Sequence, residues 1–538
     1  MSVDHVALLP AYCAAGTAVL AFLVDLVAPG RRLPVLTATM LGAAVTGVAA
    51  WWAYRGTARA TFCVADACSY YWNPLAVLVA IAVAAATFGV LALSVPLLRA
   101  REVPAGEYCF LLACSMTGGV VLGASGDLVT LVVALETLTL PLYVLVGLRR
   151  RTVASAEAAV TFFIVSVIST AVTLLGAALL YGATGTVHLA GLRAALAASA
   201  DGSASSGAAP IVGAAVVLVL VGLAFKVAAV PFHAWAPATY DGAPLPVAAY
   251  LSTASKLGGV VSLLLVAVGA LGPMLDLAGP ALAVLAVLTM TVGNLVALRQ
   301  RRMVRLLAWS SVAQAGYILA PLGAFALAPG RVEDAVVAAV TAVLAYTVFY
   351  LIMELGAFGA VVALRGSADG GEINDYRGAA RRRPWVTTAF VLALAGLAGL
   401  PPGLAGLFAK VAVVRSLLDG AAGWLAVVVA LNAVVGLAYY VRVAAVLFQP
   451  AGSGMATGPG MATGRGASAE PDGASAVPGA GAVPGAGAVS GVGAVSSGAG
   501  RVRLPVAVGA VVAAVTLLAL VVGFAPQLVL DAASAAAR

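Results

Sequence analysis

The chain has 538 residues, of which 63% are hydrophobic and only 9% charged, and its mean hydropathy is +1.08. This composition excludes an ordinary soluble globular domain, and apolar runs recur at about 20 residues, the length a helix needs to cross a bilayer core. The long unbroken Ala/Val/Leu runs also argue against a β-barrel. The formal net charge of +8 comes from arginine clusters beside the apolar runs, as in membrane-orienting loops. We therefore predict an all-α, polytopic membrane protein that does not bind nucleic acid.

Fourteen apolar segments, taken in chain order, predict 14 transmembrane helices. The segments start near Val6, Leu33, Pro74, Glu107, Leu128, Ser155, Ile211, Pro244, Leu277, Met303, Ala335, Pro384, Gly423 and Leu504. No basic cluster precedes the first segment, so we expect a retained helix there rather than a cleaved signal peptide. An even number of helices places both termini on one side of the membrane.

The arginines test this count, because cytoplasmic loops carry an excess of Lys and Arg. The odd-numbered connections between helices hold Arg31, Arg32, Arg99, Arg101, Arg149, Arg150, Arg151, Arg299, Arg301, Arg302, Arg305, Arg365, Arg377, Arg381, Arg382, Arg383, Arg465, Arg501 and Arg503. The even-numbered connections and the C-terminus hold only Arg55, Arg59, Arg193, Arg331 and Arg538. We therefore predict that the odd connections are cytoplasmic and that both termini lie outside the cytoplasmic membrane.

Two segments between the predicted helices have signatures of their own. Cys63 and Cys68 stand in the second connection, on the predicted outer side, where a disulfide can form; two free thiols are the alternative. Residues 451–502 consist largely of Gly, Ala, Val, Ser and Pro and predict a flexible cytoplasmic linker. No Cys/His grouping has the spacing of a metal site, and no Gly-rich phosphate loop is present. We therefore expect the chain itself to bind no flavin, iron–sulfur cluster or nucleotide.

Ionisable residues within the predicted helices are the candidate functional residues, because each costs about 2.5–3.5 kcal/mol to insert near the bilayer centre. The chain has only three lysines, Lys226, Lys256 and Lys410, and all lie in apolar segments. Glu136 and Glu354 lie in similar surroundings. A lysine without a counterion tends to lose its proton in an apolar medium, whereas a nearby carboxylate keeps it charged. A carboxylate that approaches and withdraws could therefore cause a lysine to take up and release a proton. An arginine could not replace the lysine in this role, because it does not lose its proton.

Helix breaks are predicted close to two of the lysines. Pro231 follows Lys226 by five positions, and Pro401-Pro402 precedes Lys410 by eight. Broken helices commonly mark the ion path in transporters. His233 stands beside the first break, where an imidazole could join a proton relay.

Structural roles compete with each of these interpretations. Glu136 and a lysine could form a static pair that only fixes helix packing, and Lys256 could extend to the membrane interface. His233 could be a hydrogen-bonded core residue, and Glu354 could contact a packed neighbouring helix. These alternatives stay open at the level of the sequence.

Four motifs resemble one family. The runs PFHAWAPATYDGAPLPVAAYLSTASK, the preceding AFK, ETLTLPLYVLVGL and GLPPGLAGLFAK are similar to subunit N of bacterial NADH-quinone oxidoreductase (respiratory complex I), an antiporter-like subunit. The resemblance extends from the third predicted helix to Phe448. A lysine at 410 favours N over the M paralogue, which usually has a glutamate there. Nothing follows the last helix beyond about Asp531, which favours N over L with its long lateral helix.

The resemblance implies proton-translocating roles for residues that match the family's motifs. In chain order these are Glu136 of the fifth helix, Lys226 of the broken seventh, His233 of the PFHxW motif, Lys256 of the eighth and Lys410 of the twelfth.

Three features depart from the family pattern. Thr161 stands where many relatives have a lysine near the start of the sixth helix, so no bridging lysine is expected there. Glu354 stands where relatives have an uncharged residue, which leaves a relay role open. The insertion at residues 451–500 is also foreign to the family.

The family architecture implies two inverted five-helix repeats with broken helices. The predicted domains are therefore three N-terminal helices (1–106), a first repeat (107–270), a second repeat (271–450), the linker (451–502) and a last helix (503–538). The expected function is to carry protons from the cytoplasm towards Lys256 and Lys226, then to Lys410 and outside. Glu136 would set the charge of Lys226 by changing its distance. Other subunits would hold NADH, FMN, iron–sulfur clusters and quinone, so the expected partners are antiporter-like and small membrane subunits and the lipid bilayer.

Two other functions remain open. A subunit of a multi-subunit cation/proton antiporter would exchange protons in response to a sodium or potassium gradient alone. A non-pumping membrane scaffold would use the same charged residues as static contacts, and loss of Lys226 would then impair assembly rather than turnover.

Overall fold

The computed structural model describes residues 3–64, 67–149, 152–200, 209–450 and 504–538. The described parts of residues 1–450, together with residues 505–538, form one compact unit. The linker predicted at residues 451–502 lies outside the described residues, and the further division at 106 and 270 remains a prediction.

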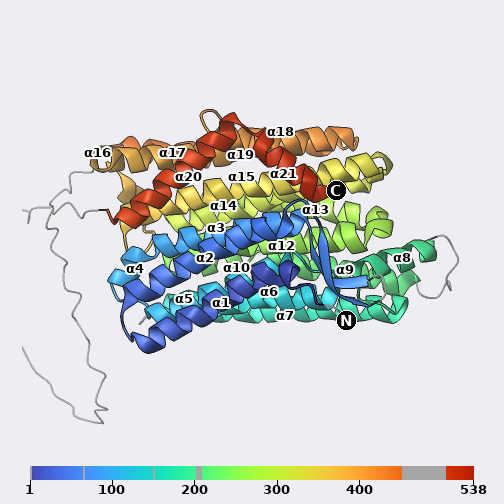
Figure 1. The fold of residues 1–538 in the computed structure, drawn as a ribbon. Coiled ribbons are helices and arrows are strands. Elements are labelled where there is room, and N and C mark those ends of the chain that lie inside the picture. The colour runs from blue at the N-terminus through green and yellow to red at the C-terminus, as the bar shows by residue number, and fades with distance from the viewer. Residues whose placement is uncertain (1–2, 65–66, 150–151, 201–208, 451–503) are drawn as a thin grey trace, which may run out of the picture. The chain divides into compact units, whose positions relative to one another are not determined.

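Long helices form most of this unit and run side by side along one direction (Figure 1). They are α1 (His5–Val27), α2 (Arg32–Tyr54), α3 (Pro74–Leu93), α5 (Ala105–Leu122), α6 (Leu128–Gly147), α7 (Val153–Thr184), α9 (Ala209–Lys226), α13 (Leu275–Ala297), α14 (Met303–Leu319), α15 (Glu333–Arg365), α17 (Pro384–Ala398), α18 (Leu404–Asp419), α19 (Gly423–Phe448) and α20 (Val506–Phe524).

Shorter helical segments join or extend them. These are α4 (Val95–Arg99), α8 (Leu189–Ala200), α10 (Trp235–Gly242), α11 (Leu245–Tyr250), the π-helical η1 (Leu251–Ser255), α12 (Lys256–Leu264), the π-helical η2 (Leu265–Ala270), η3 (Gly272–Met274), η4 (Ala320–Ala326), η5 (Ala328–Arg331), η6 (Ile373–Tyr376), α16 (Ala379–Arg382) and α21 (Gln527–Ala537).

Every one of the 14 predicted helix starts lies within two residues of a helix start in the structure. Within the described residues, 11 helices are long and apolar enough to cross a membrane, counting α11 to η2 as one. The remaining three of the 14 predicted spans correspond to shorter helices, α9, α14 and α17. Helices α9 and α17 each end at a break and resume as α10 and α18, and α14 continues into the 3₁₀ segment η4.

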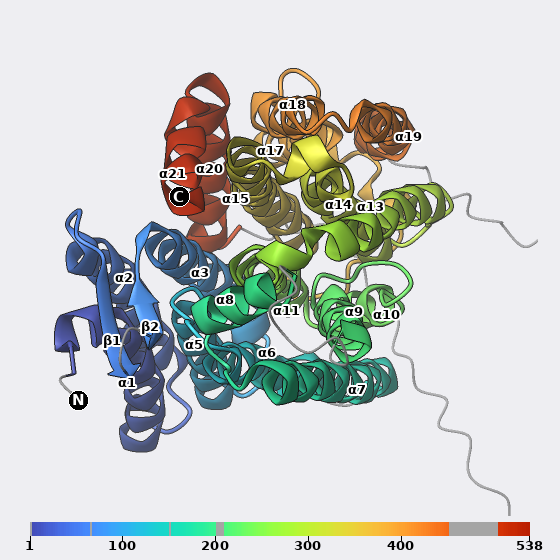
Figure 2. The ribbon, with the colours of Figure 1, turned by 90° about the vertical axis from the view of Figure 1, so that its right-hand side faces the viewer.

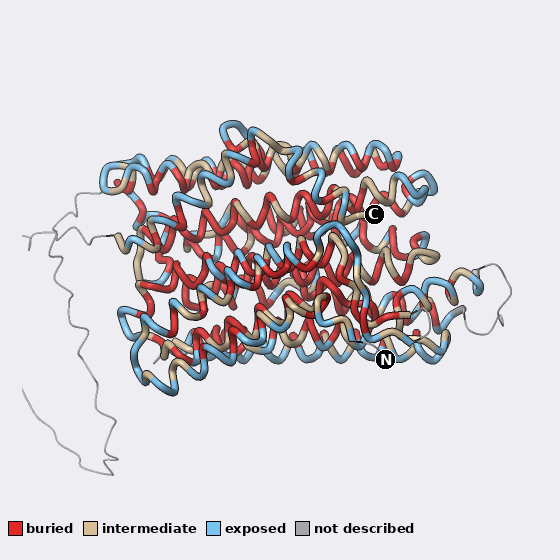
Figure 3. Tube along the Cα trace, in the orientation of Figure 1, coloured by how far each residue is buried: buried red, intermediate tan, exposed pale blue. Residues whose placement is uncertain are grey.

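The centre of the unit is formed by α11, α12, α14 and α15, which the burial pattern in Figure 3 shows as largely buried. In the helix from Leu245 to Ala270, 89% of the most apolar stretch is buried, compared with 28% in α7. A helix that is apolar all round and packed on every side belongs to the core, whereas α7 turns an apolar face outward. Val160, Phe163, Ile164 and Val167 are exposed on that face, as expected for contact with lipid or a neighbouring subunit.

A β-hairpin between α2 and α3 was not predicted from the sequence. The second connection forms an antiparallel hairpin of β1 (Arg59–Val64) and β2 (Ala67–Trp72). Cys63 and Cys68 lie opposite each other in its register and are joined by a disulfide.

The two ends of the helical unit differ in the segments they carry. The start of α1, the end of α21, the hairpin and α8 lie at one end in Figure 1, whereas α4 and α16 lie at the other. Figure 2 views the unit from the first of these ends and shows β1, β2 and α8 in front of the helices. Both terminal helices therefore have their free ends on the same side.

Candidate functional site

Glu136 and Lys226 form a buried ion pair between α6 and the last residue of α9. Lys226 Nζ donates to Glu136 Oε1 at 2.7 Å and to Ser166 Oγ at 2.8 Å. The lysine side chain is 4% exposed and the glutamate side chain 19%. Two charges taken out of water in this way stabilise each other only while they stay in contact.

Hydroxyl groups from α6 and α7 surround the Glu136 carboxylate. Thr170 Oγ1 donates to Oε1 at 2.5 Å, and Thr139 Oγ1 and Tyr143 OH donate to Oε2 at 3.3 and 3.5 Å. Tyr143 also donates to Ser166, the hydroxyl that accepts from the lysine. The pair therefore sits in a polar cluster whose hydroxyls can each donate and accept.

The break after Lys226 leaves backbone groups that neighbouring side chains satisfy. Val230 N donates to Thr289 Oγ1 of α13 at 2.9 Å, and Trp235 Nε1 donates to the carbonyl of Phe225 at 3.2 Å. Such partners let a helix end within a membrane without unpaired donors. The lysine is thus held at the end of a helix.

Lys256 lies at the centre of the unit, directly after the π-helical η1. Its side chain is buried, its Nζ donates to the carbonyl of Ser311 at 2.6 Å, and it lies 5.9 Å from the centre of the Tyr350 ring. Tyr350 OH donates to the carbonyl of Ser252 in η1 at 2.9 Å and contacts Ser311 Oγ at 2.8 Å. The ammonium group therefore points into the helix bundle rather than to an interface.

Glu354 is a fully buried carboxylate on α15, one turn after Tyr350. Neither of its oxygens has a hydrogen-bond partner among the described residues. A buried carboxylate without a donor is costly, and it often signals a functional role.

Lys410 follows the second break, on α18. Its Nζ donates to the carbonyl of Ala398 at 2.5 Å and to that of Leu397 at 3.4 Å, and it lies 5.1 Å from the centre of the Tyr317 ring. These carbonyls end α17, where they lack partners in the next helical turn. The break therefore creates the acceptors that hold the lysine.

Polar side chains of α14 lie between Lys256 and Lys410. Gln314 donates to the carbonyl of Leu397 at 3.0 Å and to Tyr440 OH at 3.1 Å, and it accepts from Tyr346 OH at 2.6 Å. Tyr440 OH in turn contacts Ser310 Oγ at 2.5 Å. Because Leu397 also accepts from Lys410, this chain of contacts reaches the third lysine.

A side branch leads from the Lys410 end towards α13 and α19. Asn294 donates to Tyr317 OH at 2.8 Å and to the carbonyl of Asn432 at 3.1 Å, and it accepts from Tyr439 OH at 3.1 Å. Asn432 donates onward to Thr291 Oγ1 at 3.3 Å. Buried polar groups in this region are therefore paired rather than isolated.

The candidate residues do not all come together. Within the described residues, no hydrogen bond links the cluster of Lys226 to that of Lys256. His233 packs against Trp309, with ring centres 5.1 Å apart, and its buried Nδ1 has no partner among the described side chains and backbone. Thr161 lies exposed on α7. Across the part of the chain that the structure describes, no group of three or more His, Cys, Asp or Glu side chains could hold a metal ion.

The polar residues that connect the charges were not predicted from the sequence. Ser166 and Thr170 are spaced i, i+4 on α7, and Ser310, Gln314 and Tyr317 are spaced i, i+4, i+7 on α14. Polar residues at helical spacing within apolar runs are a detectable sign of a buried polar face.

The family model described as "NADH:quinone oxidoreductase/Mrp antiporter, TM" matches residues 125–436. Subunit N of NADH-quinone oxidoreductase from Salinispora tropica is 63% identical over 534 residues, which cover 99% of this chain and 99% of the relative. Subunit N 2 from Streptomyces griseus is 44% identical over 472 residues, covering 85% and 86%.

Solved structures agree. A chain of respiratory complex I from Thermus thermophilus with bound aureothin matches with a TM-score of 0.72 and 26% identity, covering 98% of this chain and 99% of that one. A chain of the Mrp complex from Dietzia sp. DQ12-45-1b matches with a TM-score of 0.76, 23% identity and coverage of 99% and 97%, which shows a shared fold. The chain is therefore a multi-pass membrane protein that belongs to the subunit N family of NADH-quinone oxidoreductase.

Proposed function

We propose that this chain translocates protons across the cytoplasmic membrane as subunit N of an NADH-quinone oxidoreductase. The observation that carries the proposal is the buried pair of Glu136 and Lys226, whose ammonium and carboxylate lie 2.7 Å apart at the end of a broken helix. Lysine and glutamate can both exchange protons, and transporters place such residues on ion paths within the membrane.

The pair works as a switch through distance. While Glu136 stays in contact, it stabilises the protonated lysine; withdrawal or protonation of Glu136 leaves a buried ammonium without a counterion. Removing one partner of a buried pair typically costs about 3–5 kcal/mol, which favours release of the proton from Lys226. Tyr143 and Ser166 are close enough to receive it or to pass it on.

The route continues through the centre of the unit. Lys256 and Glu354 are the groups that can exchange protons there, and Tyr440, Ser310 and Gln314 lead to Lys410. The direction runs from the cytoplasm towards Lys226 and Lys256 and from Lys410 to the outside. His233 serves as a relay beside the first break.

Electron transfer takes place in other subunits. These bind NADH, FMN, iron–sulfur clusters and quinone, and this chain contributes no redox site of its own. Its partners are the antiporter-like and small membrane subunits of the complex. Both termini and the β1–β2 hairpin face the outside of the cell membrane, opposite the arginine-rich connections.

The test compares Lys226→Met with Lys226→Arg in the intact complex, measuring assembly on a native gel, quinone reduction and proton pumping. Arginine keeps a positive charge for Glu136 but does not release its proton. We expect both variants to assemble and both to lose pumping. Thr161→Ala, on the exposed face of α7, is the matched control and should keep activity.

Three outcomes would contradict the proposal. Full pumping by Lys226→Arg would show that no proton leaves this site and that the pair is a static contact. Loss of assembly in Lys226→Met together with full activity in Lys226→Arg would favour a scaffold. Proton exchange driven by a sodium or potassium gradient without NADH would instead identify a secondary antiporter.

A further inference from the structure

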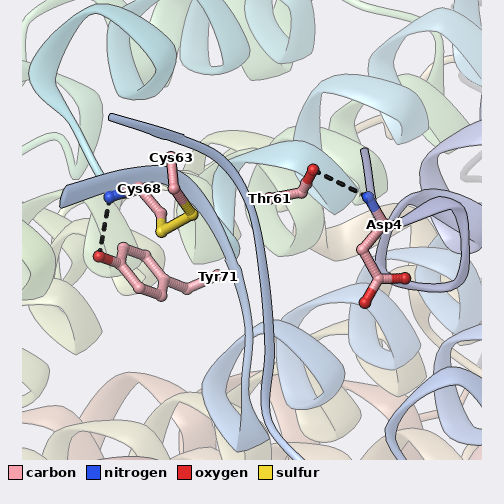
Figure 4. Close-up of a disulfide and its surroundings, with 5 residues drawn as sticks. All are labelled: Asp4, Thr61, Cys63, Cys68 and Tyr71. Atoms are coloured by element: carbon pink, nitrogen blue, oxygen red, sulfur yellow. Dashed lines mark hydrogen bonds between the residues drawn. A yellow bond between two sulfur atoms is a disulfide. The ribbon is translucent and has the colours of Figure 1, made fainter. Parts of the chain in front are cut away.

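The β1–β2 hairpin is closed by a disulfide and is also hydrogen-bonded to the start of α1. The Cys63–Cys68 disulfide closes the turn end, and the Cys68 backbone N–H donates to the hydroxyl of Tyr71 at 3.0 Å (Figure 4). Further along β1, Thr61 Oγ1 accepts from the backbone N–H of Asp4 at 3.1 Å, which ties the hairpin to the start of α1. The disulfide therefore fixes a strand that is anchored elsewhere.

Strand β2 holds the loop between α5 and α6. Tyr71 N donates to the carbonyl of Ala124 at 2.8 Å, and Gly126 N donates to the carbonyl of Ser69 at 2.9 Å. The approach is so close that a Cβ on Gly126 would lie 2.3 Å from the carbonyl oxygen of Cys68. These hydrogen bonds and this close approach hold the loop against β2.

The same loop leads into α6 and is hydrogen-bonded to the segment that follows α7. The Asp127 carboxylate caps α6 by accepting from the N–H and the hydroxyl of Thr130 at 2.7 and 2.8 Å. Leu128 N donates to the carbonyl of Val187, just after α7, at 3.0 Å. One junction therefore ties the start of one helix to the end of the next.

These two helices supply the surroundings of the ion pair. Glu136 lies nine residues into the helix that Asp127 caps, roughly 13 Å along its axis. From α7, Thr170 donates to Glu136, and Ser166 accepts from Lys226. The relative position of α6 and α7 thus sets the geometry around Glu136.

We propose that the disulfide-closed hairpin is a positioning element for the Glu136–Lys226 pair, and that reduction of Cys63–Cys68 slows proton transfer there. This inference rests on the proposed function of the pair. A dithiol such as dithiothreitol supplies two electrons and two protons. The S–S bond breaks, two thiols form, and the reductant becomes a cyclic disulfide. The hairpin then keeps its strand pairing but loses the covalent closure of its turn.

The experiment uses the assembled wild-type complex in proteoliposomes, with and without dithiothreitol, and a Cys63→Ser/Cys68→Ser variant as control. Alkylation and mass spectrometry confirm the state of the two thiols. We expect reduction of the disulfide to lower the rate of NADH-driven pumping by between about two- and tenfold, the size of effect that altered coupling between distant sites commonly has. We also expect the pH profile of pumping to shift. The variant should start at the lowered rate and not respond to the reductant.

A second variant tests the junction without redox chemistry. Gly126→Ala pushes against the carbonyl of Cys68 and should shift the pH profile in the same direction while the disulfide stays closed. Confirmed reduction with unchanged rate and pH profile would overturn the inference. If Lys226→Arg abolishes pumping in that case, the proposed function stands and only the positioning role of the hairpin is wrong.

Discussion

Lys410 lies directly against Gly399, the residue that ends α17 with a φ of +79°. A Cβ at position 399 would come within 2.7 Å of the lysine Cδ and 3.0 Å of its Nζ. The glycine therefore serves two purposes: it allows the left-handed turn at the break, and it leaves room for the lysine to reach the carbonyls of Leu397 and Ala398.

The first prediction concerns this contact. Gly399→Ala should displace Lys410 from its acceptors and lower proton pumping by roughly tenfold, since small misplacements of reacting groups have large effects on rate. Pumping and quinone reduction by the assembled complex are the measurements. Gly16→Ala in α1 is the control, because among the described residues no atom outside the adjoining backbone of its own helix lies within 4 Å of a Cβ there. Normal pumping by Gly399→Ala would mean that the position of Lys410 does not matter.

The second prediction concerns the link along α14. Gln314→Leu removes the partner of Tyr346, Tyr440 and Leu397, and each buried polar group left unpaired costs about 1–3 kcal/mol. We expect lower thermal stability of the complex and a larger loss of pumping than of assembly. Gln300→Leu is the control, since that amide lies in the connection after α13 and donates to the nearby carbonyl of Val296 at 3.2 Å. Equal pumping in the two variants would place the proton route elsewhere.

The third prediction separates a relay role of Glu354 from a structural one. Glu354→Gln keeps the volume but removes a fully buried carboxylate whose oxygens have no partner among the described residues. The variant should be more thermally stable than the wild type, because less charge is desolvated. Pumping should nevertheless fall, because the glutamine amide cannot take up and release a proton as a carboxyl group can. A gain in stability with unchanged pumping would rule out the relay role.

The fourth prediction is a pH dependence at the start of α1, outside the membrane-spanning segment. Burial raises the pKa of Asp4, but hydrogen bonds from Ala7, Arg59 and Val6 and the charge of Arg59 outweigh it and hold the pKa below its usual range. A carboxyl group with a lowered pKa stabilises the fold above its unfolded pKa of about 4 and loses this effect as the pH falls through the folded value.

Hydrogen exchange of the β1 amides in wild type and Asp4→Asn measures this effect. Asparagine still caps the helix but has no charge for Arg59. Wild-type protection should exceed that of the variant at pH 7, and the difference should disappear in strong acid. A difference that persists unchanged at pH 2 would show that the charge of Asp4 is not its cause.

The positions of the helices could be predicted from the sequence because each helix needs an apolar run to span the bilayer. Such runs end at charged or turn residues. The hairpin was missed because strands of six residues between two long helices leave little periodicity to detect. Helix α8 lies between two predicted spans and is too short to register as a further one.

The charged residues of the site could be predicted because charge is rare in this chain, whereas their partners could not. The contact of Gln314 with Leu397 joins residues 83 positions apart, and that of Ser310 with Tyr440 joins residues 130 apart. Which helix faces meet at these points depends on how the whole bundle packs. Hydroxyl and amide side chains are also common within apolar helices, so composition alone does not single them out.

Lys226 and Lys410, each beside a broken helix, differ in how easily a mutation can remove their binding partners. Lys226 depends on the side chain of Glu136, so a single substitution can remove its counterion. Lys410 binds to main-chain carbonyls, which every amino acid at positions 397 and 398 supplies. Sequence drift around the second break can therefore alter the side chains there without deleting the acceptors of its lysine, whereas the first site survives only while one particular carboxylate is retained.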